Sequence, residues 1–262
     1  MLKKVIALGL VFIMAMACLT ACGGQKLTVE SVQKAGKLVI GTSPDFPPFE
    51  SLSADGKVEG IEIEIMELIC QELGVELEIK QMDFDSVLPG VQTGKFNVGV
   101  SGISVTPERE KNTLFTVPYC LAAQAIVVTT GSPITSKADL AGKTVSVQTG
   151  TTAEEFCMKN GYAVKAFAAN ADAETALTVG KVDAWVIDDL TAAEMVAAYN
   201  EEHPDAPLVI LDEAMTTEPY AFAFAQGNDE LVAKINEILN KLLADGTIAE
   251  IFEKYNAPYT AP

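Results

Sequence analysis

Short apolar, strand-like segments alternate with helical patterns along this chain, and the alternation restricts the fold more than any other feature. Residues 38–41 form a continuous apolar run typical of a buried strand, and residues 61–73 place apolar side chains at helical spacing up to Gly74. Residues 75–100 continue as strand, short helix and strand. A chain with this alternation is expected to form an α/β fold with largely parallel sheets.

A weak internal repeat suggests two lobes of similar construction. The segment Gly94–Ser101 resembles Gly180–Ile187, since each begins with Gly-Lys after a helical pattern and continues as a strand. Coincidence is the alternative, because helix, Gly-Lys and strand often follow one another in α/β proteins. Near the C-terminus, residues 228–243 predict a long amphipathic helix, and residues 248–255 predict a further short one.

The first residues have the pattern of an export signal. Two lysines precede an apolar stretch from Val5 to Ala17, which is shorter than the roughly 20 residues that a membrane-spanning helix needs. The sequence around Cys22 resembles a bacterial lipobox, which predicts a signal peptide over residues 1–21 and a lipidated Cys22 that begins a tether over residues 22–26. The alternative is an ordinary signal peptide in which Cys22 is incidental. Several acyl chains on one residue give stable membrane anchoring.

Composition excludes several classes of function. Acidic residues outnumber basic ones 36 to 18, which argues against a nucleic-acid partner, and 49% apolar residues suffice for a substantial core. Cys70, Cys120 and Cys157 follow the leader with no metal-like spacing, so no metal site is predicted; one disulfide with a leftover thiol stays open. The only histidine, His203, lies in a polar stretch, so zinc and Ser-His or Cys-His catalysis have little basis.

Arg109 is the only arginine, and all other cations are lysine. A guanidinium can hold a carboxylate bidentately, which lysine cannot do with the same geometry. Thr106 and Pro107 predict the cap and first position of a helix that fixes where Arg109 emerges. The alternative is a surface arginine paired with an adjacent glutamate.

Several separated motifs resemble the amino-acid-binding proteins of ABC importers, a bacterial solute-binding family with the type 2 periplasmic-binding-protein fold. The matching segments occur in the family's order over nearly the whole chain after the leader, at residues 41–50, 83–89, 101–109, 148–152, 182–188 and 218–220.

This resemblance implies a two-lobed α/β fold in which each lobe is a mixed, mostly parallel sheet flanked by helices. Residues 27–121 plus 216–262 would form one lobe and residues 122–215 the other, joined by crossing hinge strands near residues 120–124 and 216–220. A monomer of this kind captures a free amino acid outside the cell and delivers it to a membrane permease with ATPase subunits. Ligand contacts on both lobes would stabilise the closed state.

The resemblance also implies a site for the ligand carboxylate. It lies between Arg109, the hydroxyl and amide of Ser104, the amide of Gly102 and, from the second lobe, the amide of Thr152. Residues 148–152 read as a strand-to-helix turn, and a helix N-terminus favours an anion. Gln148 and Thr151 of this turn are therefore ligand-binding candidates.

Asp188 is the expected partner of the ligand ammonium, at the carboxyl end of a strand where α/β sheets place ligands. Asp189 is the competing assignment, although strand alternation and the resemblance favour Asp188. The carbonyl of Ser101 is a second expected acceptor for the ammonium.

The ligand side chain is expected between the aromatic rings of Phe46 and Phe84. Either ring could belong to the core instead, and the rigid Pro-rich turn makes Phe46 the stronger candidate. Many family members carry aspartate where this chain has Ser43, so a cationic ligand side chain is in doubt. Asp45 is close to Ser43 in the sequence.

Two rival functions stay open at this stage. An enzyme on the same scaffold, such as a dehydratase, needs an acid–base residue in the cleft, and no motif supports Asp45, Glu50 or Asp188 in that role. A receptor that signals to a membrane sensor is the other. We expect a non-enzymatic binding protein without cofactor, anchored by lipid to the outer face of the cell membrane.

Overall fold

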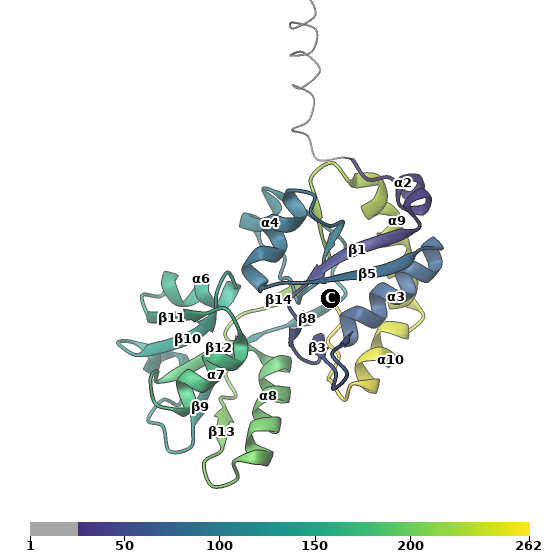
Figure 1. The fold of residues 1–262 in the computed structure, drawn as a ribbon. Helices are drawn as coiled ribbons and strands as arrows, with labels where there is room; N and C mark the ends of the chain where they lie inside the picture. The colour runs from purple at the N-terminus through teal and green to yellow at the C-terminus, as the bar shows by residue number, and fades with distance from the viewer. Residues whose placement is uncertain (1–25) are drawn as a thin grey trace, which may run out of the picture.

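The structure is a computed structural model, which describes residues 26–262. The predicted signal peptide, Cys22 and all but the last tether residue lie outside the described residues. Within residues 26–262 two α/β lobes lie side by side, connected by the strands β8 and β14 (Figure 1). In this part of the chain no helix is both long and apolar enough to cross a membrane.

The first lobe is built on a five-stranded sheet with the order β5-β1-β6-β15-β7. Strand β1 pairs in parallel with β5 and β6, whereas β15 pairs antiparallel with β6 and β7. The strands are β1 (Lys37–Thr42), β5 (Glu76–Gln81), β6 (Val98–Gly99), β7 (Thr113–Phe115) and β15 (Ala223–Ala225). Strand β6 is shorter than the strand predicted over residues 96–100. The reason is that the Val39 amide donates its hydrogen bond to the side-chain oxygen of Asn97, at 2.8 Å, and not to a backbone carbonyl of this segment.

The second lobe has a five-stranded sheet with the order β11-β10-β12-β9-β13. Strand β10 pairs in parallel with β11 and β12, whereas β9 pairs antiparallel with β12 and β13. Its strands are β9 (Gln124–Thr129), β10 (Thr144–Gln148), β11 (Ala163–Phe167), β12 (Ala184–Asp188) and β13 (Leu208–Ile210). Both sheets are mixed, and their parallel share is smaller than the alternation of strands and helices indicated, because β9 and β15 follow directly after the connections between the lobes.

The internal repeat corresponds to equivalent strands. The two repeated segments contain β6 and β12, which are the central strands of the two sheets. Gly94 and Gly180, which open the segments, both have left-handed backbones, with φ of 71° and 72°. The repeated segments therefore occupy equivalent positions in the sheets of the two lobes.

The helices follow the predicted pattern closely. Helix α3 (Ile61–Leu73) has the predicted bounds and ends at Gly74, whose φ of 72° suits glycine. Helices α9 (Asp229–Ala244) and α10 (Thr247–Lys254) lie one residue from the predicted positions, and Figure 1 shows them beside α3. The remaining α-helices are α2 (Val29–Ala35), α4 (Val87–Gln92), α5 (Pro107–Glu110), α6 (Thr152–Lys159), α7 (Asn170–Thr178) and α8 (Asp189–Glu202), and the 3₁₀ turns are η1 (Phe84–Ser86) and η2 (Lys137–Leu140).

Burial of these helices on the sheets forms the cores. In the first lobe, Ile65 of α3, Ile235 of α9 and Phe252 of α10 pack in one buried cluster with Leu38 of β1. In the second lobe, the indole of Trp185 is fully buried among residues of α7 and α8. Burial of this kind stabilises the fold by roughly 25 cal/mol per Å² of apolar surface.

Two small sheets lie near the junction of the lobes. Strands β8 (Cys120–Ala122) and β14 (Glu218–Tyr220) pair antiparallel and form the expected crossing connection. Strands β2 (Asp45–Phe46), β3 (Glu50–Leu52) and β4 (Val58–Glu59) form a three-stranded sheet.

The cysteines are buried and the histidine is exposed. Cys70, Cys120 and Cys157 are all buried and free, so no disulfide joins them. His203 is exposed at the end of α8, where its ring stacks on Tyr199 with centroids 4.2 Å apart. Among residues 26–262 no group of three histidine, cysteine, aspartate or glutamate side chains has a metal-binding arrangement.

Candidate functional site

A small cavity of about 20 Å³ lies where the two lobes meet, and side chains of both lobes line it. The first lobe contributes Phe46, Phe84, Ser101, Gly102, Ser104 and Arg109. The second contributes Gln148, Thr151, Thr152, Ala153, Asn170, Val186, Ile187 and Asp188. All predicted ligand-binding residues except Ser43 therefore come together around one cavity.

The residues that sequence reasoning missed have recognisable positions. Val186 and Ile187 directly precede Asp188 on β12, and Ala153 follows Thr152 in α6. Asn170 is the first residue of α7, a helix start that no motif had marked. Val186 and Ile187 already lie in the matching segment 182–188, and Ala153 directly follows the segment 148–152. Asn170 lies outside every matching segment.

Arg109 enters the cavity from α5, whose start is fixed as predicted. The hydroxyl of Thr106 accepts the Arg109 amide at 3.2 Å, and Pro107 occupies the first helical position. The guanidinium donates from Nη1 to the Ser104 carbonyl at 2.9 Å and from Nη2 to the Gly150 carbonyl of the other lobe at 3.1 Å. These two carbonyls orient the guanidinium without neutralising it.

The charge of Arg109 has no counter-ion in the described protein. Its side chain is 9% exposed, and none of the ion pairs among residues 26–262 includes it. Burial lowers its pKa below the ordinary value, although more distant carboxylates, beginning with Glu155, oppose this effect. A buried, unpaired cation is costly, so the site favours an anion that binds beside it.

Asp188 is the opposite half of this arrangement. It is the last residue of β12, 8% exposed, and its carboxylate accepts a hydrogen bond from the hydroxyl of Tyr220. Burial is the main cause that raises its pKa to about 8; the negative charge of Glu218 adds to it, and the Tyr220 hydrogen bond opposes it. No ion pair in the described part of the chain includes Asp188.

Asp189 is directed elsewhere. Its Oδ1 accepts the amides of Ala123 at 3.2 Å and Leu190 at 2.8 Å, and the residue is not part of the cavity lining. Of the two adjacent aspartates, Asp188 is therefore the one that reaches the cavity.

Ser101 and Gly102 line the cavity, and one polar group of each is held by a glutamate from outside the lining. The Gly102 amide donates to Oε2 of Glu62 at 2.9 Å, so the contact predicted between this amide and a ligand carboxylate is not available in this conformation. The Ser101 hydroxyl donates to Oε1 of Glu50 at 3.0 Å and accepts the Ser43 amide at 3.1 Å. Neither glutamate was among the predicted site residues.

The turn from β10 to α6 supplies amides from the second lobe. Thr151 caps α6, since its hydroxyl accepts the Glu154 amide at 3.1 Å and donates to the Gln148 carbonyl at 2.7 Å. Thr152 is the first residue of the helix, and its hydroxyl accepts from Nε2 of Gln124 at 3.0 Å. The first amides of a helix have no intrahelical acceptor, which leaves them available to an anion.

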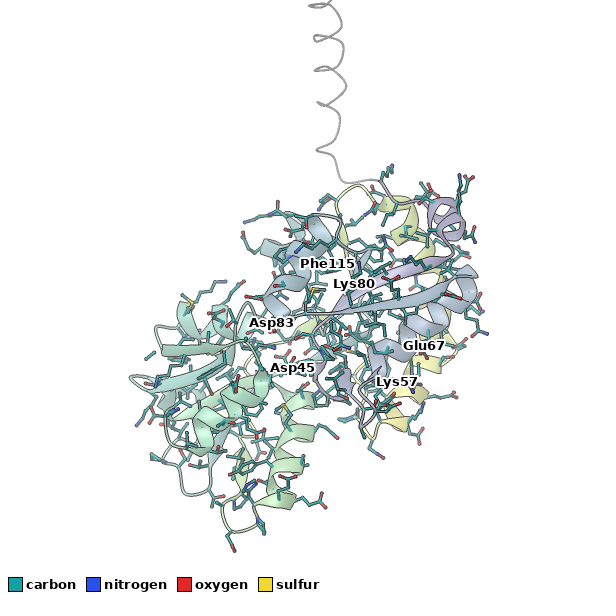
Figure 2. All side chains as sticks on the ribbon, viewed as in Figure 1. Asp45, Lys57, Glu67, Lys80, Asp83 and Phe115 are labelled. Atoms are coloured by element: carbon teal, nitrogen blue, oxygen red, sulfur yellow. The ribbon has the colours of Figure 1, made fainter. Side chains whose placement is uncertain are left out.

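Ser43 is buried, but its side chain binds Asp45 and is not part of the cavity lining. Its hydroxyl donates to Oδ1 of Asp45 at 2.9 Å. Asp45 lies where the lobes meet (Figure 2), and its Oδ2 accepts the Asn170 amide at 2.9 Å and Nε2 of Gln148 at 3.1 Å. The carboxylate that follows Ser43 therefore links the two lobes.

The rings of Phe46 and Phe84 both line the cavity, and Phe46 also packs against the core of the first lobe. Phe46 lines the cavity and also stacks on Phe49 of the first core, with ring centroids 5.8 Å apart. Phe84 lines the cavity from η1, and the Arg109 guanidinium lies 5.8 Å from the centre of its ring.

Chemically, the cavity presents one unpaired cation and one carboxyl group from opposite lobes. A ligand that carries an anionic and a cationic group on adjacent atoms can satisfy both at once. The remaining wall combines aromatic and aliphatic side chains with the polar residues Ser101, Ser104, Gln148, Thr151, Thr152 and Asn170.

Comparisons with known proteins identify the family of the chain. The model of the bacterial extracellular solute-binding proteins, family 3, matches residues 38–258. The L-cystine-binding protein TcyJ of Escherichia coli (strain K12) is 29% identical over 231 residues, which are 87% of this chain and 85% of that protein.

Solved structures of the same fold are also similar. The crystal structure of the P235GK mutant of ArgBP from T. maritima superposes with a TM-score of 0.80 at 36% identity, covering 87% of this chain and 99% of that one. The ancestral amino acid-binding protein AncCDT-1, a precursor of cyclohexadienyl dehydratase, has a TM-score of 0.78 at 33% identity and covers 87% and 98% of the two chains. With most of its length matched in sequence and in fold, the chain belongs to the bacterial extracellular solute-binding proteins, family 3.

Proposed function

We propose that this protein captures a free α-amino acid in the cavity between its lobes. The observation that supports this most strongly is the pair of buried groups Arg109 and Asp188, which have no counter-ion among residues 26–262. An amino acid supplies a carboxylate for the first and an ammonium for the second, so its binding compensates two desolvated groups together.

In this proposal Arg109 holds the ligand carboxylate together with Ser104, the capping residue Thr151 and the amide of Thr152, which begins α6. Asp188 holds the ammonium, with the Ser101 carbonyl as second acceptor. Phe46 and Phe84 flank the ligand side chain, with Gly102 and Gln148 completing the wall. Ser43 acts through Asp45.

The lobes are proposed to open and close about β8 and β14, with residues 27–121 plus 216–262 in one lobe and 122–215 in the other. A ligand shifts this equilibrium only through contacts that it makes with both lobes in the closed state. The protein adds contacts of its own between the lobes, from Arg109 to Gly150 and from Asn170 to Asp45, and opening would break them.

Delivery to a membrane permease with ATPase subunits is the proposed purpose of capture, with a monomer held at the outer face of the membrane by a lipid on Cys22. Membership in an extracellular solute-binding family supports capture outside the cell. The lipobox-like sequence around Cys22 supports the anchor. The named relative TcyJ is a binding protein for L-cystine, an amino acid.

An enzymatic function is the second candidate, and one observation favours it: a solved relative is described as a precursor of a dehydratase. Asp188 is the cavity's only carboxyl group among the described residues, and the proposed function uses it for the ammonium. A sensor that signals to a membrane receptor would use the same cavity. We infer that binding without chemistry is the function.

The experiment is a thermal-shift screen of the protein against the common amino acids, followed by calorimetry on any ligand that stabilises it. Arg109→Ala is expected to reduce affinity at least tenfold, about 1.4 kcal/mol or more. Unchanged affinity in this variant would refute the carboxylate assignment. Product analysis after prolonged incubation with the ligand tests the enzyme alternative, which requires turnover.

A further inference from the structure

Two buried carboxyl groups lie directly behind the cavity, outside the set of residues that line it. Glu50 belongs to β3 and Glu62 to the first turn of α3, and both residues are 0% exposed. Glutamate is almost never fully buried unless it is paired. None of the ion pairs in the described part of the chain includes either residue.

The two glutamates hold the segment that forms the wall of the cavity. Glu62 accepts the Tyr119 hydroxyl on Oε1 at 2.5 Å and the Gly102 amide on Oε2 at 2.9 Å. Glu50 accepts the Ser101 hydroxyl on Oε1 at 3.0 Å. Ser101 and Gly102 therefore each have one polar group fixed by a buried carboxyl group.

The two glutamates belong to one packed junction. The amide of Glu62 donates to the carbonyl of Phe49, the neighbour of Glu50, at 3.1 Å, and the two side chains hold the consecutive residues Ser101 and Gly102. Both oxygens of Glu62 accept hydrogen bonds from other groups, whereas Oε2 of Glu50 is buried without a hydrogen-bond partner. An ionised carboxylate can only accept hydrogen bonds, so Oε2 of Glu50 is the oxygen of the two side chains that is free to carry a proton.

The surroundings favour retention of this proton. Titratable groups near the pair are Asp45 of β2, Tyr119 directly before β8 and Cys120 at the start of β8, and none of them is a cation. Burial, followed by the negative charge of Glu62, raises the pKa of Glu50 well above its ordinary value. A carboxyl group beside another carboxylate in a dry site shares one proton with it.

We propose that Glu50 and Glu62 form an acid–carboxylate pair with one shared proton, and that this pair positions the Ser101–Gly102 backbone against the ligand. The second half rests on the proposed function. Gly102 has a left-handed backbone with φ of 53°, and a Cβ at this position would lie 2.6 Å from the Phe46 ring. The segment thus has little room, and fixed acceptors behind it maintain its conformation.

The pair can be tested with two glutamine substitutions whose effects should differ. Glu50→Gln keeps a donor towards Glu62 and an acceptor for Ser101, so the affinity for the stabilising amino acid should fall less than threefold. Glu62→Gln places an NH₂ group against the Gly102 amide or the Tyr119 hydroxyl, and affinity should fall at least tenfold. Equal losses, or none in Glu62→Gln, would overturn the assignment.

The matched control is Glu67→Gln, which removes an exposed glutamate from the same helix α3 (Figure 2). It should bind like the wild type. If Glu62→Gln does not fold, Tyr119→Phe removes one donor to Glu62 while its ring keeps the stack on Phe222, where the centroids lie 5.1 Å apart. This variant should lower affinity more than the control does, and an equal affinity would count against the positioning role.

The shared proton has a readout that does not need a ligand. Infrared difference spectra at pH 7 should show the carboxylic-acid C=O stretch when Glu50→Gln is subtracted from the wild type, and no such band for Glu67→Gln. Absence of the band in the first spectrum refutes the proton. If no amino acid binds, the proposed function and the positioning role both fail. The infrared band would still show whether Glu50 carries a proton.

Discussion

Replacing Asp188 by asparagine is expected to remove a pH dependence of amino-acid binding between pH 6 and pH 8. Burial, with a contribution from Glu218, raises the pKa of Asp188 to about 8. At pH 7 the carboxyl group is therefore mostly protonated before the ligand binds. An ammonium binds the ionised form, so the ligand must expel this proton.

The size of the effect follows from the pKa of about 8. The ionised fraction rises from about 1% at pH 6 to about 50% at pH 8, which limits the gain in affinity to about fiftyfold, or about 2.3 kcal/mol. At pH 7 about 0.9 protons are released per ligand bound. The Asp188→Asn variant should bind more weakly at pH 8, with no proton release from this position.

Isothermal titration calorimetry at pH 6, 7 and 8, in two buffers of different ionisation enthalpy, measures both quantities. Asp189→Asn is the matched control, because the neighbouring carboxylate is outside the cavity lining and any titration of the ligand itself is common to all variants. A wild-type affinity that is constant over this range, without proton release, would refute the reasoning. So would an Asp188→Asn variant with the wild-type slope.

Four further outcomes are expected. In the ligand-free protein, Asp188 stabilises the fold below pH 4 and loses this contribution as the pH rises towards its folded pKa of about 8. Asp188→Asn should therefore raise the free energy of unfolding at pH 7 by on the order of 4 kcal/mol, measured by urea titration. An unchanged or lower free energy of unfolding would contradict this. Arg109→Lys should lower affinity at least tenfold by calorimetry, because the bidentate geometry is lost; wild-type affinity would show that charge alone suffices. Asp45→Ala removes an acceptor that joins the lobes, so small-angle scattering should report a larger radius of gyration without ligand; an identical curve would show that this contact does not hold the lobes together. Gly41→Ala would bring a Cβ within 2.3 Å of the Phe96 ring, so thermal unfolding should report a loss of about 1–3 kcal/mol, and wild-type stability would mean that the ring moves freely aside.

Local signals made much of the fold predictable from the sequence. Helix α3 was predicted to the residue because its apolar spacing and Gly74 are both properties of one short segment. Strand β6 was predicted too long, because the side chain of Asn97 replaces a backbone group in the ladder, and periodicity carries no information about such a substitution.

In the candidate site, cavity-lining residues within the motif-bearing segments were predictable from the sequence. Asn170 and the partners that are distant in the sequence were not. Asp45 and Asn170 are 125 positions apart, and Glu62 reaches Gly102 over 40 positions. The sequence marks none of these partners, because each pairing depends on how the lobes and the small sheet at the junction pack. The same dependence explains why Ser43 supports Asp45 instead of lining the cavity.

The three free, buried cysteines among residues 26–262 allow local unfolding to be measured in the unmodified sequence. Cys70 lies in α3 of the first lobe, Cys157 in α6 of the second and Cys120 in β8 of the connection. Burial raises the pKa of Cys70 to about 11 and that of Cys157 to about 12, so neither thiol reacts readily while its surroundings stay packed. The rate at which each thiol is alkylated thus measures how often its own part of the molecule unfolds. Local unfolding of the two lobes and of their connection can therefore be compared in one protein without introducing further cysteines.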